Sequence, residues 1–482
     1  MDGREVRAWA REEFGGAQLG DRRRTARLVS MAATVASKPS GRVSSVFCRA
    51  AERQAAYDFV ESVHVDEAAI LESAVGACVE RAGEYPFVFV PLDGTSLNLA
   101  DHARTKDFGS IGSRERGARG LKVINAIAVS PSGVPVGLAG MRLWARGPKP
   151  TRHKRRRVTE DKETRHWLDA VARVTAAFGD QPRGPRVWFQ VDREGDAEAL
   201  LHALAESGEW FTVRSNSERR LTTGDEHVTQ RRRYLRAHLS RRKPVGYDLL
   251  EVPARDGRPS RLACLALRVA RVVLKTRDKR LLRHKDLTVN VVWAREYGAR
   301  ATRSSRSGRS SYRALDWLLL TNHPVDTLED ARKVVFGYTQ RWRVEDFHRA
   351  WKSGVCNVED NQLRVRTHVI RWATVLAAVA IRAERLKHLS RERPTEPATV
   401  EFSALEIETL ILLKRHYRKR TETITDDVPD LETATRWVAE LGGYTGKSSG
   451  GPPGAITIRR GLDYLRPAAE ALALSRASGK KR

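Results

Sequence analysis

Cysteine is scarce in this sequence of 482 residues, and its four cysteines form no closely spaced pair. The wide separation of Cys48, Cys78, Cys264 and Cys356 argues against a zinc ribbon and against a disulfide framework. The 13 histidines include no H-E-x-x-H motif, so a zinc hydrolase site is not indicated. Cysteine usage of this kind fits a reducing cytoplasm.

Long apolar runs are also missing. No run approaches the roughly 20 residues of a membrane span, and the N-terminal string MDGREVRAWAREEF has no signal-peptide hydrophobic region. The string Gly109–Gly112 lacks the Lys-Ser/Thr of a phosphate-binding loop, so nucleotide hydrolysis is not indicated. We therefore expect a soluble, cytoplasmic protein without a nucleotide cofactor.

Positive charge is present in excess. Lys and Arg number 87 against 59 Asp and Glu, which leaves a formal net charge of +28. An acidic polymer is the expected partner of such a protein, although charge alone does not distinguish a DNA-binding protein from a ribosomal or merely Arg-rich one. At this length, with 41% hydrophobic residues, we expect two or three domains with a sizeable core.

Residues 1–70 have the pattern of basic helices. Trp9, Phe14 and Leu19 are apolar markers, and a basic helix follows, with Asp21 placed to cap its N-terminus. Its arginines fit a solvated helix face or, in a protein this basic, a surface that grips DNA phosphates. The candidate phosphate contacts are Arg22, Arg23 and Arg27.

From about residue 86 the pattern changes to strands. Two continuous apolar runs, Phe87–Leu92 and Val187–Val191, enclose a predicted hairpin made of residues 123–129 and 134–139. A helix is predicted over residues 161–178. Continuous apolar strands imply burial on both faces, so we expect an α/β fold with a mixed sheet covered by helices.

Residues 216–312 interrupt this pattern with polar, basic, strand-like segments and a Ser/Arg-rich loop at 302–311. Their charge density and sparse core residues indicate a β-rich insertion that lies on DNA. The last part of the chain, residues 371–482, reads mainly as helices.

The stretch Tyr338–Lys352, YTQRWRVEDFHRAWK, is predicted to be helical. At about 100° per residue, Tyr338, Arg341, Glu345 and Lys352 fall within roughly 60° of one another on that helix. An Arg and a Glu at this spacing are most often a solvated surface pair. A carboxylate flanked by cations is, however, also what cutting a polyanion requires.

Three acids are the candidate metal ligands. Asp93 and Asp192 directly follow the two apolar strands, and Glu345 lies on the helix. Hydrolysis of a phosphodiester is served by two Mg²⁺ ions about 4 Å apart, held by hard oxygen ligands. We expect Asp93 to bridge both ions, with Asp192 and Glu345 holding one each. Asp192 is favoured over the nearby acids because it is the first polar residue after its strand.

The order Tyr-x₂-Arg-x₃-Glu-x₆-Lys resembles the Y-R-E-K signature of a family of bacterial insertion-sequence transposases that includes the transposon-five transposase. Four other segments resemble that family: Trp9–Arg24, the D-G-T-S string beginning at Asp93, Trp317–Thr321 and Trp437–Gly443. The resemblance implies a cut-and-paste DDE transposase with a ribonuclease-H-like fold. Such an enzyme nicks the transposon end, forms and opens a DNA hairpin, and joins the 3′-hydroxyls to target DNA.

The resemblance also implies a domain plan and partners. Residues 1–70 would bind transposon ends, residues 71–370 would form the catalytic domain with the insertion at about 216–312, and residues 371–482 would mediate dimerisation and DNA contact. Mg²⁺, replaceable by Mn²⁺, would be the cofactor. The partners would be double-stranded DNA and a second copy of the chain, and the protein would be associated with the bacterial nucleoid.

Further DNA contacts are expected around the acids. Arg341 and Lys352 would bind phosphates, one through its planar fork and the other as a point charge. Tyr338 could donate to a phosphate oxygen or simply pack at the start of the helix. The resemblance implies that Trp317 stacks on a flipped base, although an ordinary core tryptophan fits equally well. Two more candidate DNA contacts are Arg214 and Arg349.

Two alternatives stay open. One is a catalytically inactive transposase-derived protein that binds or regulates DNA, which the presence of all three acids disfavours. The other is a free-standing nuclease that cuts DNA but never joins ends.

Overall fold

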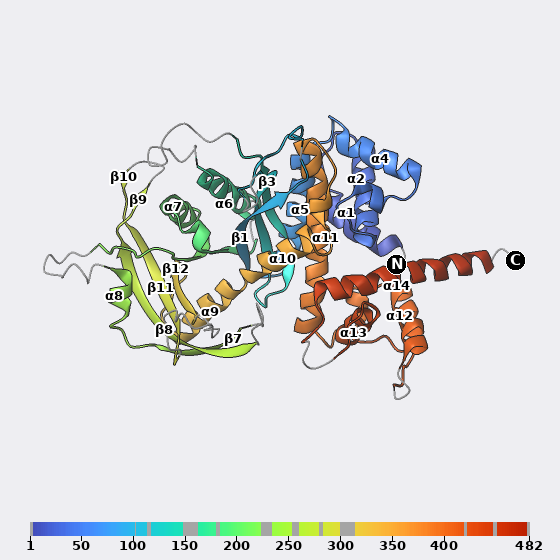
Figure 1. Ribbon diagram of the computed structural model, residues 1–482. Coiled ribbons are helices and arrows are strands. Elements are labelled where there is room, and N and C mark those ends of the chain that lie inside the picture. Colours follow the sequence, from blue (N-terminus) through green and yellow to red (C-terminus); the bar gives the residue numbers. More distant parts are fainter. Residues whose placement is uncertain are drawn as a thin grey trace.

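The computed structural model describes residues 3–101, 103–112, 117–147, 162–179, 184–222, 234–252, 260–278, 283–298, 314–418, 422–446 and 451–479 (Figure 1). The described residues form a mixed α/β structure, in which a sheet is flanked by helices and both ends of the chain are helical. The Ser/Arg-rich loop at 302–311 lies outside the described residues.

The N-terminal part consists of helices, as the sequence predicts. Asp21 caps the second helix, because its side chain accepts a hydrogen bond of 2.8 Å from the backbone N–H of Arg23. Phe14 and Leu28 are fully buried where the first two helices pack together. The helices are α1 (Gly3–Phe14), α2 (Arg22–Ser37), α3 (Val43–Val46), α4 (Ala50–Glu61) and α5 (Glu67–Ala82).

The centre of the sheet joins an antiparallel half to a parallel half. In the antiparallel half, β4 pairs with β3 and β3 pairs with β1; in the parallel half, β1 pairs with β5 and β5 with β6. The predicted hairpin is therefore β3 and β4. The strands are β1 (Phe87–Asn98), β3 (Arg119–Val129), β4 (Pro135–Trp144), β5 (Arg186–Val191) and β6 (Trp210–Arg214).

The insertion continues this sheet. Beyond β6 the order is β12, β11, β8 and β7, all paired antiparallel, and together with the short β2 this makes a ten-stranded sheet of described residues. Leu265, Val291 and Ala294 are fully buried, so the expectation that the insertion has few core residues was wrong. These strands are β7 (Gly246–Val252), β8 (Arg261–Leu274), β11 (Leu287–Glu296) and β12 (Asp316–Thr321).

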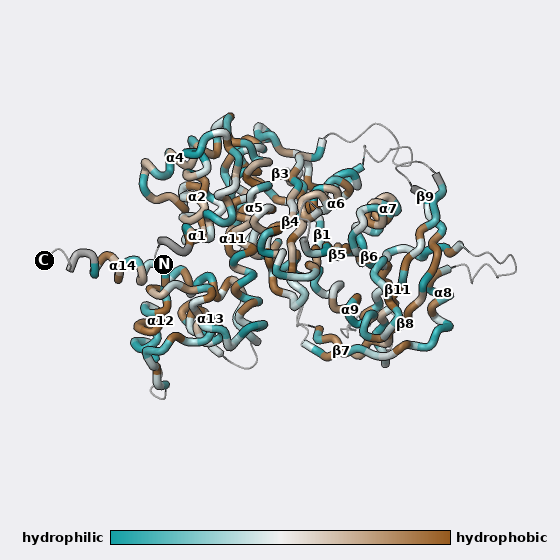
Figure 2. The backbone as a smooth tube through the Cα atoms, turned by 180° about the vertical axis from the view of Figure 1, so that it is seen from behind, coloured by the Kyte–Doolittle hydropathy of each residue, from teal (hydrophilic) through white to brown (hydrophobic). Residues whose placement is uncertain are grey.

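Helices cover both faces of the sheet. One face packs against α6 (Thr164–Gly179) and α7 (Glu198–Glu206), and the other packs against α9 (Leu328–Thr339) and α10 (Trp342–Lys352). Side chains of β1 alternate between the two cores: Val88 and Val90 belong to the first, and Phe89 to the second. Figure 2 shows hydrophobic stretches along the strands and the covering helices. By this alternation, Asp93 faces the α10 side.

A long helix, α11 (Arg366–Glu392), runs between the sheet and the N-terminal helices and contacts both (Figure 1). Its C-terminal end joins a third core, which is shared with α12 (Ala404–Tyr417), α13 (Leu431–Leu441) and α14 (Ala455–Gly479). The domain boundaries expected near residues 70 and 370 fall inside α5 and α11. None of the described helices is long and apolar enough to cross a membrane.

The remaining elements are short. They are β2 (Gly109–Ser110), η3 (Arg193–Gly195), α8 (Leu235–Leu239), β9 (Arg277–Asp278), β10 (Arg283–His284), η5 (Val358–Asp360) and η6 (Ala398–Val400).

Candidate functional site

Strand register places two of the three candidate acids side by side. The last parallel pair between β1 and β5 is Leu92 with Val191, and the next residue on each strand is Asp93 and Asp192. Asp192 ends β5, as expected, and its carboxylate accepts a hydrogen bond of 2.7 Å from the Glu194 N–H. The expectation that Asp93 ends its strand was wrong, because β1 continues to Asn98 along its antiparallel partner β3.

The pKa of Asp93 reflects its burial and the two other candidate acids. Asp93 is 9% exposed. Burial and the neighbouring Asp192 carboxylate raise its pKa to about 7, with a smaller contribution from Glu345, while Arg341 and the Gly94 N–H oppose the rise. This pocket therefore concentrates negative charge, which a hard cation would neutralise.

The helix that carries Glu345 is interrupted. We predicted one continuous helix over Tyr338–Lys352, but α9 ends at Thr339 and α10 begins at Trp342. The turn between them is tightened by i→i+3 hydrogen bonds, including Arg341 N–H to Tyr338 O at 3.2 Å. Tyr338 therefore belongs to the end of α9, while Glu345 lies in the first turn of α10.

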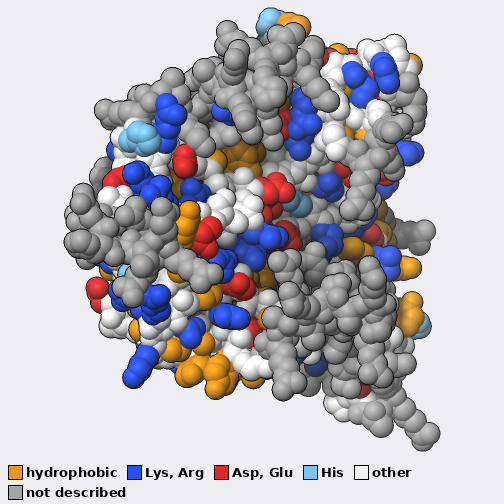
Figure 3. Space-filling view, turned by 60° about the vertical axis from the view of Figure 1, so that its left-hand side comes forward, with side chains coloured by type: hydrophobic (Ala, Val, Ile, Leu, Met, Phe, Trp, Pro, Cys, Tyr) orange, Lys and Arg blue, Asp and Glu red, His pale blue; other side chains and the backbone are white. Residues whose placement is uncertain are grey.

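Arg341 lies between two of the acids. Its Nη2 donates to Glu345 Oε1 at 2.6 Å, and its Nη1 lies 3.7 Å from Asp93 Oδ2. The Arg341 side chain is about nine-tenths buried. An arginine expected to bind phosphate thus balances the charge of two candidate metal ligands in this structure. Figure 3 shows acidic side chains beside Lys and Arg side chains near the centre of one face.

Lysines flank the acids on the β1 side. Lys352 Nζ lies 3.4 Å from Glu359 Oε1 and 3.5 Å from Thr95 Oγ1, so Lys352 reaches the strand that carries Asp93. Lys122, which sequence reasoning missed, lies on the neighbouring strand β3 and donates a hydrogen bond of 2.9 Å to Ser96 Oγ on β1. Burial lowers the pKa of Lys122. A lone lysine near the start of an apolar strand was the signal available in the sequence.

Tyr338, Trp317 and Arg214 meet on the other side of the acids. Trp317 is buried, with its ring edge-on to Tyr338 at 5.1 Å and to Trp342 at 6.1 Å. Arg214 hydrogen-bonds Tyr338, and its Nη2 donates to the Asp316 carbonyl at 3.3 Å. Trp317 is a core tryptophan in this structure, and stacking on a DNA base would require it to become exposed.

The other predicted DNA contacts lie apart from the acids. Arg349, on the outer side of α10, is exposed and pairs with Asp346 at 3.2 Å. Arg22, Arg23 and Arg27 are exposed on the first turns of α2, in the N-terminal helices beyond α11 (Figure 1).

A nearby acid, Asp101, is held away from the candidate ligands by its own ion pair. It is buried and pairs with Arg119 Nε at 2.7 Å. It therefore anchors the loop after β1, and the pair leaves it no role beside Asp93.

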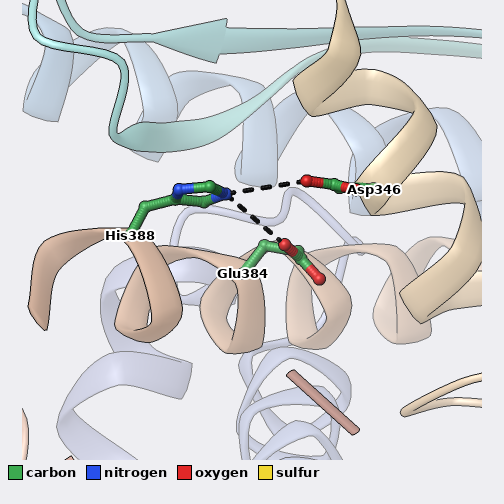
Figure 4. Close-up of side chains that lie close together, drawn as sticks. All are labelled: Asp346, Glu384 and His388. Atoms are coloured by element: carbon green, nitrogen blue, oxygen red, sulfur yellow. Dashed lines mark ion pairs between the residues drawn. The ribbon is translucent and has the colours of Figure 1, made fainter. Parts of the chain in front are cut away.

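A tighter group of potential ligands lies next to the candidate site. Among the described residues, the ligand atoms of Asp346, Glu384 and His388 all lie within 4.8 Å of one another (Figure 4), closer than those of the three predicted acids. Sequence reasoning missed this group because its members come from two helices. Lys387 carries its ammonium into the same group, where it pairs with both carboxylates.

Comparison with known families bears on the N-terminal helices. Residues 6–65 match the family model described as transposase DNA-binding. The match spans α1 to α4, so it includes the exposed arginines of α2. The N-terminal helices are therefore similar to transposase DNA-binding domains, and this similarity supports a transposase that binds DNA.

Proposed function

We propose that the protein is a DDE transposase, with a ribonuclease-H-like catalytic domain that cleaves transposon ends and transfers them into target DNA. The observation that carries this proposal is that strand register places Asp93 beside Asp192, while Arg341 pairs with both Asp93 and Glu345, although the three acids are remote in sequence. The strand–hairpin–helix–strand order of β1 to β5 supports the ribonuclease-H-like fold. The DNA-binding domain at residues 6–65 supports the substrate.

The donor set fits a pair of hard divalent cations. In this proposal Asp93, Asp192 and Glu345 hold Mg²⁺, because three carboxylates in a largely buried pocket supply hard oxygen ligands and excess negative charge. Bound Mg²⁺ would make a water or a 3′-hydroxyl a better nucleophile and would neutralise the leaving oxygen. The raised pKa of Asp93 reflects the same excess of charge.

Arg341 has two tasks in this proposal. While the acids lack a cation, its guanidinium balances Asp93 and Glu345. When the carboxylates bind Mg²⁺ instead, the Arg341 guanidinium is available to bind a DNA phosphate, which it matches in geometry and charge. Lys352 and Lys122 would add positive charge along β1, where the backbone of the cut strand would lie.

The remaining parts of the proposal follow from the resemblance and the charge. The N-terminal helices would grip transposon ends through Arg22, Arg23 and Arg27, and a net charge of +28 favours such a polyanion. The C-terminal helices would pair two copies, so that both ends are processed in one complex, with a DNA hairpin as intermediate. An inactive DNA-binding relic is not favoured, because all three acids are present, Asp93 lies beside Asp192, and Arg341 pairs with both Asp93 and Glu345.

The test uses DNA from either side of the coding frame, which should carry matching inverted repeats. A duplex that contains such an end, incubated with the full chain, is expected to be nicked and joined to a second DNA in Mg²⁺ or Mn²⁺. Ca²⁺ is expected to support binding without cleavage, because it binds oxygen ligands with looser geometry. Equal cleavage without any divalent cation would reject the proposal, and cleavage without joining would identify a nuclease.

A further inference from the structure

Three neighbouring polar residues of helix α10 point in different directions: Glu345, Asp346 and His348. At about 100° per residue, His348 lies roughly 60° to one side of Glu345 and Asp346 lies roughly 100° to the other side. His348 contacts the sheet and Asp346 contacts α11. The helix is therefore held on both flanks of the residue that must face the other acids.

The contact with the sheet reaches the cross-strand neighbour of Asp93. Asn125 on β3 is paired with Asp93 on β1, and its Nδ2 lies 3.0 Å from Nε2 of His348. Both side chains are buried. Burial lowers the pKa of His348 to about 3, so the ring is neutral and Nε2 can accept the hydrogen bond from the Asn125 amide. One hydrogen bond thus connects the helix of Glu345 to the strand beside Asp93.

The contact with α11 is ionic. Lys387 Nζ lies 3.2 Å from Asp346 Oδ2 and also pairs with Glu384. His388 Nε2 lies 3.8 Å from the same Asp346 oxygen, as Figure 4 shows. The hydrogen bond with His388 and the charge of Lys387 keep the pKa of Asp346 low despite burial. A metal ion is not favoured here, because the Lys387 ammonium already pairs with both carboxylates.

We infer that the Asn125–His348 hydrogen bond and the Asp346–Lys387 ion pair set the rotation of α10 and thereby position Glu345 as a metal ligand. His348 and Asp346 are positioning residues on this view, and the inference rests on the proposed function. A carboxylate lies about 6 Å from its helix axis, so a 20° rotation would move it by about 2 Å. Metal–ligand distances tolerate only about 0.2 Å, so small rotations matter.

The test compares two substitutions at one position. In His348→Gln, the side-chain amide can occupy the position of Nε2 and keep the hydrogen bond to Asn125. In His348→Asn, the shorter side chain reaches only the position of Nδ1 and cannot contact Asn125. Asn125→Leu and Asp346→Asn remove the two contacts separately. The readouts are the Mn²⁺ dissociation constant, measured by electron paramagnetic resonance on the full chain, and the melting temperature.

The inference predicts different outcomes for these variants. His348→Asn, Asn125→Leu and Asp346→Asn should each weaken Mn²⁺ binding about 10-fold or more, as outer-shell changes do, while His348→Gln should stay within about 3-fold of wild type. The control is Thr276→Val, which removes a buried hydrogen bond of 3.0 Å between the segment that joins β8 to β9 and His202 on α7. It should lower the melting temperature without weakening Mn²⁺ binding.

Other results separate the two proposals. If His348→Asn, Asn125→Leu and Asp346→Asn bind Mn²⁺ like wild type while Glu345→Gln binds it weakly, the positioning role is wrong and the catalytic assignment stands. If Glu345→Gln binds Mn²⁺ like wild type, the catalytic assignment itself fails. If Thr276→Val weakens Mn²⁺ binding as much as His348→Asn, the effect reflects general destabilisation and the positioning role is overturned.

Discussion

Glu345→Gln is expected to slow strand cleavage by at least about 10³-fold, equal to about 4 kcal/mol of activation free energy. The amide keeps the shape of the side chain but loses the negative charge that a divalent cation requires. It also loses the ion pair with Arg341 at 2.6 Å, which leaves that guanidinium with Asp93 as its acidic neighbour in the site. The measurement is the single-turnover rate of cleavage of an end-containing duplex in Mg²⁺.

Binding to the same duplex should survive this substitution. The transposase DNA-binding domain, residues 6–65, does not include Glu345, and removing a negative charge does not oppose binding to a polyanion. The matched control is Glu408→Gln on α12, where an exposed carboxylate pairs with Arg476 and should contribute little. Cleavage by Glu345→Gln at the rate of the control would remove Glu345 from the catalytic site.

The sequence singled out the candidate acids Asp192 and Glu345 through simple local patterns. Apolar strands that are buried on both faces must end in polar residues, and Asp192 does end its strand. Helical periodicity placed Arg341 one turn before Glu345, and their side chains do meet. The capping of α2 by Asp21 was predictable for the same reason, since a cap depends on residues within one turn.

What the sequence could not supply is register and long-range pairing. No local pattern states that Leu92 pairs with Val191, yet this register brings Asp93 beside Asp192. The insertion was misjudged because its strands, such as β7, carry many polar residues and acquire a core only by joining the sheet. Close packing between α9 and the sheet is likewise not visible in the sequence: a Cβ on Gly337 would lie 2.6 Å from the ring of Phe89.

A second expected result concerns the junction between the N-terminal helices and the rest of the protein. Gly41→Ala should lower the free energy of unfolding by about 3 kcal/mol, which combines typical costs of overpacking and of a lost hydrogen bond. A Cβ at Gly41 would lie 2.0 Å from the carbonyl oxygen of Asn357. Relief requires backbone movement, because that oxygen belongs to the loop between α10 and α11, where Asn357 is already left-handed with φ 49°.

The same movement would break a second contact. The Gly41 carbonyl accepts a hydrogen bond of 2.8 Å from Nε1 of Trp372, a fully buried residue of α11. Chemical denaturation followed by tryptophan fluorescence measures the stability. Because a chain with several cores need not unfold in one step, limited proteolysis should accompany it, and we expect faster cleavage between the N-terminal helices and the sheet.

Gly76→Ala is the control, and it is expected to raise the free energy of unfolding where Gly41→Ala lowers it. Gly76 lies inside α5 and a Cβ there would meet nothing within 4 Å, so alanine should stabilise the helix by about 1 kcal/mol through its higher helix propensity. Both substitutions add one methyl group to a glycine. If Gly41→Ala unfolded at the same denaturant concentration as Gly76→Ala, the close contact between Gly41 and Asn357 would not exist in solution.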